Sequence, residues 1–316
     1  MRIFSADETA AALPYPPLIA KISELFAAGL KAPLRHHHTL ANPQGQNATL
    51  LLMPAWQSQQ GFGGVKIANI HPDNAKRGLP AVIASYLLFR EDTGEHLALL
   101  NGSVLTARRT AAASALGARY LANPQAQTLL ILGAGRVARE LPEAFSSLFP
   151  LKRILIWNRS PARAHSLVKE LQALQRWKVE LVSDLKAAVA QAEIISCATL
   201  AQQAVLFGAW LQAGQHVDLI GSFTPQMREV DDEAMQKAQV YIDTEAALHE
   251  SGDLLFPLQT GALDPNAIRG SFYDLCKLEH SQHQPQAMTV FKGVGHAVED
   301  LAAAIVAYQA QDNLKK

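Results

Sequence analysis

Apolar and polar positions along the first hundred residues predict an α+β region. Ser5 and Glu8 have the spacing of a capping box, so a short helix should follow them and stop at Pro14. From about 17 to 30 apolar residues recur at helical intervals, which predicts a second helix. Strand-like runs then follow at 49–53, 64–68, 82–90 and 96–100. The last two flank the turn-forming residues 91–94 and predict a hairpin, so an antiparallel sheet is expected here.

The pattern changes after an Ala-rich segment, 106–121, that predicts a long helix ended by Asn123 and Pro124. Short apolar runs lie at 128–132, 154–157, 179–182, 194–197, 217–220 and 240–242. Helix-compatible segments lie between several of them, at 135–149, 161–175 and 184–191. Continuous apolar runs are typical of strands buried on both faces of a parallel sheet. Their alternation with helices predicts an α/β fold with a doubly wound sheet.

A last amphipathic helix, from His296 to about 311, has apolar residues along one face. We expect this helix to return to the first region of the chain. A length of 316 residues leaves room for two domains, because a single core seldom grows past about 250–300 residues. The expected domains are residues 1–113 plus 296–316, and residues 114–295.

Composition and charge narrow the functional classes. The chain is 49% hydrophobic and 18% charged, as in globular proteins, and its formal net charge is zero. A neutral chain argues against a general nucleic-acid binder. No apolar run reaches the ~18 residues of a membrane span and no signal peptide is visible, so we expect no membrane partner and a cytoplasmic location. Cys197 and Cys276 alone cannot form a disulfide framework or a zinc site.

The segment Gly133-Ala134-Gly135-Arg136-Val137-Ala138 matches the dinucleotide fingerprint G-x-G-x-x-A. It follows a predicted strand and opens a predicted helix, which is the context that the motif requires. Gly133 permits a tight turn, Gly135 lets the backbone approach a pyrophosphate, and Ala138 lets helix and strand pack closely. We therefore expect residues 133–137 to bind a dinucleotide at the helix N-terminus; a chance glycine-rich turn is the alternative.

The end of the next predicted strand indicates which dinucleotide is bound. NAD sites place an Asp or Glu there to bind the ribose 2′-hydroxyl. This chain has Asn158, Arg159 and Ser160 instead, with Arg163 one turn later. These side chains offer no carboxylate but can hydrogen-bond a 2′-phosphate. NADPH is therefore the expected cofactor, with NADH as the alternative; Arg159 as a solvated turn residue is the opposing interpretation.

Several further segments resemble the ornithine cyclodeaminase/mu-crystallin family, in the same order and over nearly the whole chain. Beside the glycine fingerprint they are Gly64-Val65-Lys66, Leu105–Ala112, Trp157–Ser160 and Thr289–Asp300. The resemblance implies a homodimer whose N-terminal α+β domain binds substrate and dimerises. It also implies a Rossmann domain inserted before a returning C-terminal helix.

The same resemblance implies the site residues. Around the carboxylate of an amino or imino acid substrate it places Arg35, Lys66 and Arg109. Along the cofactor it places Thr199, Ile220 and Gly221, and beside the nicotinamide it places Val294, Gly295 and His296. Catalytic roles are expected for Lys66, Arg109 and His296.

One departure from the family pattern bears on the reaction. Ornithine cyclodeaminases have a catalytic Asp in a Gly-Gly-Asp-Cys-Pro-like stretch, and Phe223 takes its place here. A phenyl ring cannot accept a proton, which argues against cyclodeamination. The chain is most similar to the family's Δ1-pyrroline-2-carboxylate reductases.

The implied activity is therefore NAD(P)H-dependent reduction of a cyclic imino acid. The substrate would be Δ1-pyrroline-2-carboxylate, giving L-proline, with Δ1-piperideine-2-carboxylate, giving L-pipecolate, as its six-membered homologue. The alternatives are an ornithine cyclodeaminase, an alanine-type amino acid dehydrogenase and a mu-crystallin-like cofactor-dependent binding protein.

Two basic residues carry more specific expectations. Lys66 should point away from the side of Val65 and Ile67, because successive strand residues face opposite sides. If Lys66 is buried beside Arg109, its ammonium should have a lowered pKa, which would suit a proton donor. Arg108 is expected on the helix surface.

The remaining polar candidates have modest expected roles. His36, His37 and His38 cannot all converge on one ion if they lie on a strand, so no metal site is expected and a surface or pocket-rim run is favoured. His296 either donates a proton or packs. Glu299 and Asp300 are expected only to favour the positive end of the last helix.

Overall fold

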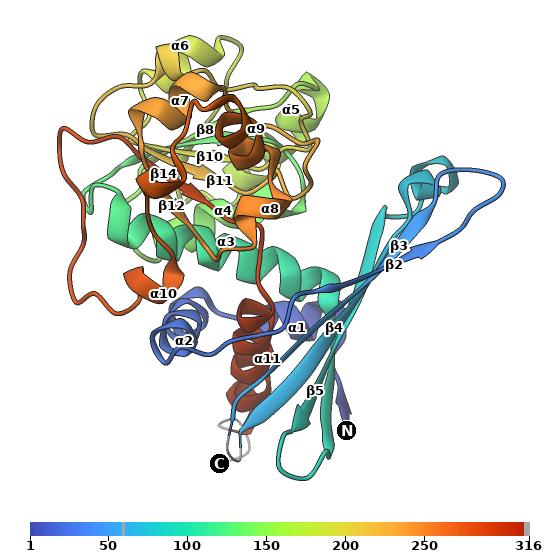
Figure 1. Ribbon diagram of the computed structural model, residues 1–316. Coiled ribbons are helices and arrows are strands. Elements are labelled where there is room, and N and C mark those ends of the chain that lie inside the picture. Colours follow the sequence, from blue (N-terminus) through green and yellow to red (C-terminus); the bar gives the residue numbers. More distant parts are fainter. Residues whose placement is uncertain (59–60, 313–316) are drawn as a thin grey trace. The chain divides into compact units, whose positions relative to one another are not determined.

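The structure is a computed structural model that describes residues 1–58 and 61–312 (Figure 1). The chain forms two compact units, one of Met1–Arg109 with the segment that begins at His296, and one of Thr110–Gly295. The chain passes from the first unit to the second within one continuous helix, α3 (Gly102–Leu121). It passes back between Gly295 and His296, and Gly295 has a φ of +80°.

The first unit contains a six-stranded sheet in the order β1-β6-β5-β4-β3-β2. Its strands are β1 (Arg2–Ile3), β2 (His36–Leu40), β3 (Ala48–Trp56), β4 (Phe62–Ile70), β5 (Val82–Arg90) and β6 (His96–Asn101). Neighbours are antiparallel except for β1 and β6. The predicted hairpin is confirmed as β5 and β6.

The helices of this unit begin and end where local chemistry requires. The predicted capping box is confirmed at Ser5, ahead of α1 (Ala6–Ala11). α2 (Tyr15–Ala27) starts and stops earlier than expected, with Pro residues in its first turn and Gly29 at φ +73° just after its end. α11 (Ala297–Asp312) packs against α2 and against β3, β4 and β5. The 3-10 helix η1 (Pro72–Arg77) connects β4 to β5.

The second unit contains an eight-stranded, fully parallel sheet in the order β13-β12-β14-β11-β10-β7-β8-β9. Its strands are β7 (Thr128–Leu132), β8 (Arg153–Trp157), β9 (Lys178–Leu181), β10 (Ile194–Cys197), β11 (His216–Leu219), β12 (Gln239–Ile242), β13 (Ile268–Gly270) and β14 (Thr289–Lys292). Six of them correspond to the predicted runs. β13 is only three residues long and β14 contains a lysine, so neither forms the uninterrupted apolar run that marked the others.

Helices cover both faces of this sheet. On one face Gly117 of α3 lies so close to Phe291 that a Cβ there would be 2.8 Å from the ring. On the other face Val217 and Leu219 pack with Leu185 and Ala234. The helices are α4 (Arg136–Ser146), α5 (Pro161–Ala173), α6 (Leu185–Val189), α7 (Asp232–Lys237), α8 (Ala247–Glu250), α9 (Gly252–Thr260) and α10 (Phe272–Leu275), with 3-10 turns η2 (Gly208–Trp210) and η3 (Pro265–Ala267). The expected α/β class, with a doubly wound sheet inserted into an α+β unit, is confirmed.

Candidate functional site

The glycine fingerprint forms the turn between β7 and α4. Gly133 has a φ of +130°, and a Cβ on it would lie 2.5 Å from the carbonyl oxygen of Ala198, so only glycine fits. Gly135 is the N-cap of α4 and is exposed, with no atom within 4 Å of the position of a Cβ. The packing of the protein therefore requires Gly133 but leaves space beside Gly135. That space, at the N-terminus of an 11-residue helix, suits a phosphate group.

The order of the strands places this turn at the switch point of the sheet. β8 and β9 extend from one side of β7, whereas β10 and β11 extend from the other. Ligands of open α/β sheets bind outside the carboxyl ends of the strands where the order reverses. Gly133 follows β7 and Thr199 comes soon after β10, so both lie at the reversal. The residues expected on the cofactor side thus share one edge of the sheet.

The end of β8 has the polar character that the sequence predicted. Arg159, Ser160 and Arg163 are exposed around the start of α5, and the Asn158 amide donates to the Ser160 carbonyl at 3.0 Å. No residue from 158 to 163 is acidic. A ribose 2′-hydroxyl would find no carboxylate in this stretch, whereas a 2′-phosphate would find two guanidinium groups.

A buried carboxylate, Glu229, holds the loops that follow β10 and β11. Its oxygens accept hydrogen bonds from the backbone N–H of Thr199 at 2.7 Å, from the Thr199 hydroxyl at 2.8 Å and from the backbone N–H of Gly221 at 2.7 Å. Ile220, which precedes Gly221 in the chain, is half-buried. Glu229 could not be predicted from the sequence, because a lone acid after a proline-containing loop carries no recognisable motif.

In the first unit, Lys66 and Arg109 lie together in a buried cluster with two carboxylates. The Lys66 Nζ is 2.8 Å from the Asp300 Oδ2 and donates to its Oδ1 at 3.0 Å. The Arg109 Nε donates to the same Oδ1 at 2.8 Å, and its Nη1 donates to the Glu299 Oε2 at 2.6 Å. The four residues come from β4, α3 and the first turn of α11, and none is more than 5% exposed.

This cluster corrects the modest role expected for Glu299 and Asp300. They do lie in the first turn of α11, but they also neutralise Lys66 and Arg109. Only an indirect signal could have revealed Glu299 and Asp300. Buried cations need anionic partners, and the set of expected site residues contained no acid, so acidic partners had to come from elsewhere in the chain.

The buried pairs shift the protonation equilibria of the cluster. Burial lowers the pKa of Lys66 to about 8; Asp300 opposes the fall, and the charges of Arg109 and Arg35 add to it. Burial tends to raise the pKa of Asp300, but Arg109 and Lys66 outweigh it and hold that pKa below its ordinary value. For Arg109, burial disfavours the charge, yet Asp300 and Glu299 raise its pKa further. The prediction that burial lowers the pKa of Lys66 is thus confirmed.

His296 is neutral at physiological pH, because burial and then the charge of Arg35 lower its pKa to about 4. Its ring lies 5.8 Å from that of Phe26, and its Nδ1 accepts from the Val298 N–H at 3.4 Å. A neutral ring with an accepting Nδ1 carries its proton on Nε2. His296 can therefore donate a hydrogen bond, but it holds no easily released second proton.

Two other expectations can be compared with the structure. Arg108 is not a surface residue: it is 9% exposed, stacks 4.4 Å above the Tyr15 ring and donates to the Leu13 carbonyl. The prediction was wrong because helix periodicity does not reveal that the N-terminal chain covers this face. His36, His37 and His38 are all exposed on β2. Within residues 1–58 and 61–312 no cluster of three metal-ligating side chains is found.

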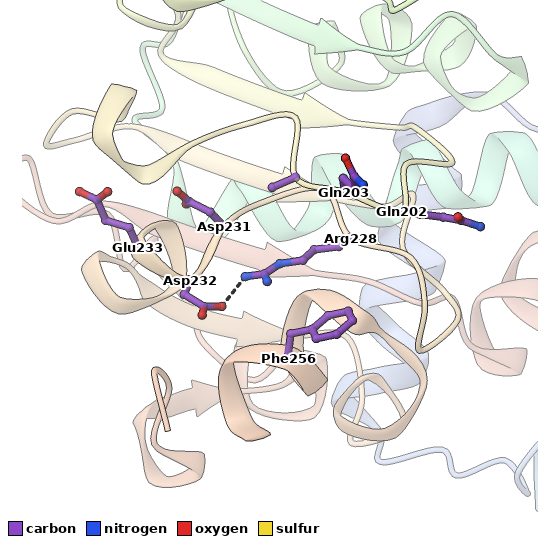
Figure 2. Close-up of a pocket in the computed structure, with 8 residues that line it drawn as sticks. Gln202, Gln203, Arg228, Asp231, Asp232, Glu233 and Phe256 are labelled. Carbon is purple, nitrogen blue, oxygen red and sulfur yellow. Dashed lines mark hydrogen bonds and ion pairs between the residues drawn. The ribbon is translucent and has the colours of Figure 1, made fainter. Parts of the chain in front are cut away.

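A separate pocket of about 510 Å³ lies in the second unit (Figure 2). Its lining includes Arg228, Asp231, Asp232 and Phe256, and it contains none of the predicted site residues. The Arg228 guanidinium pairs with Asp232, as Figure 2 shows. It also lies 5.3 Å from the centre of the Phe256 ring. Asp231 caps α7 by accepting from the Ala234 N–H. Arg228 and Asp231 thus already have partners within the protein, and none of the predicted site residues lines this pocket. We therefore do not assign the functional site to it.

Among the helices of the described part of the chain, none has the length and apolar character needed to cross a bilayer.

Comparisons with known proteins agree with these features. The model of the ornithine cyclodeaminase/mu-crystallin family matches residues 25–314. A Δ1-pyrroline-2-carboxylate reductase of Paracoccus denitrificans is 39% identical over 86% of this chain and 88% of its own length. The ketimine reductase mu-crystallin of Rattus norvegicus is 35% identical over 97% and 96%.

A solved structure shares the fold along the whole chain. It is that of the Thermococcus litoralis Δ1-pyrroline-2-carboxylate reductase in complex with NADH and L-proline. It is 28% identical, with a TM-score of 0.92 over 100% of this chain and 98% of that one. The expected family is confirmed: this chain belongs to the ornithine cyclodeaminase/mu-crystallin family.

Proposed function

We propose that this protein reduces a cyclic imino acid with a reduced nicotinamide dinucleotide. The substrate is Δ1-pyrroline-2-carboxylate, converted to L-proline, with Δ1-piperideine-2-carboxylate, converted to L-pipecolate, as its six-membered homologue. The observation that carries this proposal is the buried Lys66–Arg109 pair, which supplies fixed cations for a small acid and, in Lys66, a group with a pKa of about 8. The relatives named above, which include a reductase complex with L-proline, support the same reaction class.

The cations of the first unit favour an anionic substrate. Lys66 and Arg109 face Asp300 and Glu299, and the field of Arg35 reaches both Lys66 and His296. The fields of these cations would stabilise a substrate carboxylate that is bound beside Lys66 and Arg109. Both Lys66 and Arg109 have more N–H groups than their carboxylate partners use, so they can bind the substrate without releasing those partners.

The reaction also needs a proton at the imine nitrogen, because a protonated imine accepts hydride far better than a neutral one. When bound, the reduced dinucleotide supplies the hydride, and residues 133–137 with Thr199 and Gly221 would hold it. The Lys66 ammonium can release its proton near neutral pH, whereas His296 is neutral there and can only orient the substrate by a hydrogen bond. Lys66 is therefore the proposed proton donor, and Arg109 the proposed carboxylate anchor.

The test of the reaction is oxidation of NADPH at 340 nm with a panel of substrates. The proposal expects turnover with the five- and six-membered cyclic imino acids and little with pyruvate plus ammonia. Ammonia release from ornithine without net cofactor oxidation would favour a cyclodeaminase, which Phe223 argues against. Cofactor binding without turnover of any substrate at millimolar concentration would favour a binding protein.

NADPH is the proposed preferred cofactor, because Arg159 and Arg163 flank the exposed start of α5 and no acid is near them in sequence. Replacing Arg159 by Ala should raise the KM for NADPH about tenfold or more, as expected for loss of a charge-assisted bond of ~1.5–3 kcal/mol, and should leave the KM for NADH almost unchanged. Arg176→Ala, at an exposed arginine beyond the other end of α5, is the control. Equal effects on both cofactors would refute the preference.

A homodimer is the proposed assembly. β2 is an edge strand whose residues are all exposed, and Ile67 and Ile83 are 38% and 50% exposed on the sheet of the first unit. An open edge and exposed apolar residues favour association with a second copy. Light scattering of the purified protein should give twice the chain mass of 34.2 kDa; a monomer at micromolar concentration would exclude this assembly.

A further inference from the structure

Glu229 is completely buried, yet its carboxylate serves two different loops. One oxygen, Oε1, accepts from both the backbone N–H and the hydroxyl of Thr199, after β10. The other, Oε2, accepts from the backbone N–H of Gly221, after β11. A single side chain therefore joins the two loops at the carboxyl edge of the sheet.

The two loops are packed too closely to move independently. A Cβ on Gly221 would lie 1.9 Å from the Thr199 carbonyl oxygen, and 2.4 Å from Glu229 itself. The residue before Thr199, Ala198, is in turn the one whose carbonyl closes on the fingerprint turn at Gly133. A shift of the Thr199 loop would therefore be transmitted to the proposed pyrophosphate site.

Glu229 is itself held rigidly. Its backbone N–H donates to the Asp253 Oδ1 at 2.7 Å, and its carbonyl accepts from the N–H groups of Val205 and Leu206. Lys292, also fully buried, lies 3.4 Å from the Asp253 Oδ2 and donates to the Leu219 carbonyl. Hydrogen bonds thus fix the backbone of Glu229, and the buried cation Lys292 lies near its side chain.

We propose that Glu229 is a positioning residue for the dinucleotide: by tying the Thr199 loop to the Gly221 loop, it fixes the edge against which the cofactor lies. This inference rests on the proposed dinucleotide-dependent function. It also defines what Thr199 can offer. The Thr199 hydroxyl hydrogen is given to Glu229, so toward a ligand this hydroxyl can act only as an acceptor.

The test replaces Glu229 by Gln in the full-length protein. An amide has one accepting oxygen, so it can bond to one loop but presents N–H groups to the other. The dissociation constant of NADPH, measured by calorimetry without substrate, should rise about tenfold. The KM of the imino acid at saturating NADPH should change little. Glu233→Gln, which removes a partly exposed carboxylate of α7 paired with Lys237, is the matched control and should bind NADPH as the unmodified protein does.

Hydrogen exchange distinguishes positioning from general loss of structure. The proposal expects faster exchange at Thr199 and Gly221 in the Glu229→Gln protein, and unchanged exchange in β7 and β8. Unchanged NADPH affinity, or faster exchange throughout the second unit, would overturn it. If Glu229→Gln does not fold, Glu229→Asp, whose shorter side chain keeps the charge but cannot reach both loops, decides by the same two measurements. If the unmodified protein binds neither NADPH nor NADH, it is the proposed function that fails.

Discussion

Each unit of the molecule buries a lysine among carboxylates, but the two clusters are balanced differently. In the first, Lys66 and Arg109 meet Asp300 and Glu299, two cations with two anions. In the second, Lys292 accompanies Asp253 and Glu229, one cation with two acids. Lys66 is 4% exposed and Lys292 is 0% exposed, so neither is an ordinary surface lysine.

The difference in charge balance indicates which of the two clusters can take part in proton transfer. In the balanced cluster the pKa of Asp300 is held below its ordinary value, so Asp300 stays ionised, and it is the pKa of a cation, Lys66, that falls to about 8. In the second cluster, burial and the neighbouring Asp253 raise the pKa of Glu229, and Lys292 only partly offsets them. The first arrangement leaves a proton available near neutral pH. In the second, the Glu229 oxygens accept hydrogen bonds from the Thr199 and Gly221 loops, and so hold these loops together.

The largest expected effect is on stability, from Lys292→Met. This change leaves two buried carboxylates without their cation, and breaking such a pair costs about 3–5 kcal/mol. The free energy of unfolding in urea should fall by that amount at pH 8 and by less at pH 5, where the carboxylates can take up protons. Lys178→Met, at a side chain that is 71% exposed, should change it little. An unaltered unfolding midpoint would show that Lys292 does not balance the cluster.

Lys66→Met should instead act mainly on catalysis. Asp300 keeps its bond to Arg109, so the fold should survive, whereas kcat should fall about a hundredfold or more through loss of the proton donor. Lys76→Met, at an exposed lysine of the same unit, serves as the control for steady-state assays. A raised KM with the original kcat would mean that Lys66 only binds the carboxylate.

Asp300→Asn should shift the pH profile. Asp300 holds the pKa of Lys66 up, so without its charge the ammonium loses its proton at lower pH. The alkaline limb of kcat/KM should then move to lower pH, with a several-fold loss at pH 8. Glu299→Gln provides the comparison, because Glu299 pairs with Arg109, whereas Lys66 pairs with Asp300. Should both variants move the limb equally, the shift would not arise from the Lys66–Asp300 pair.

A further expected effect, on the pH dependence of stability, concerns Asp218, a buried carboxyl of β11 that Ser196 and Ser114 hydrogen-bond. Burial raises its pKa from 3.8 to about 7. The native state therefore holds this proton more tightly than the unfolded state. The resulting stability is complete below pH 3.8 and is lost as the pH rises through 7.

Asp218→Asn should remove this loss, which is on the order of 1 kcal/mol per pH unit within that range. Thermal unfolding between pH 5 and 8 should therefore vary less with pH in the variant. A slope that matches that of the unmodified protein would show that Asp218 does not contribute to it.

Much of the second unit could be predicted from sequence, because strands buried on both faces must be apolar throughout. The glycine turn was equally readable, since its conformation admits only glycine at Gly133. β14 was missed because only Val290 and Phe291 of its four residues are apolar, and it ends on Lys292. The prediction for Arg108 failed because its cover, Leu13 and Tyr15, lies far away in sequence.

The charged site could be predicted only in part. The family pattern gave Lys66 and Arg109 a role in the site, whereas their partner Asp300, which lies in another segment of that pattern and is 234 positions from Lys66, was expected only to favour the start of a helix. Local sequence around Asp300 reports only the start of a helix. Charge pairing between distant residues depends on how α11 packs in the first unit, and no local sequence pattern contains that information.

The late position of α11 has a consequence for synthesis on the ribosome. The second unit is one continuous stretch and can fold as soon as Gly295 has emerged. The first unit has to wait for α11, so Lys66 and Arg109 stay without their anions until that helix has been synthesised. A nascent chain stalled before Ala297 should therefore hold a protease-resistant second unit and a digestible N-terminal region, the reverse of the usual N-to-C order of domain folding.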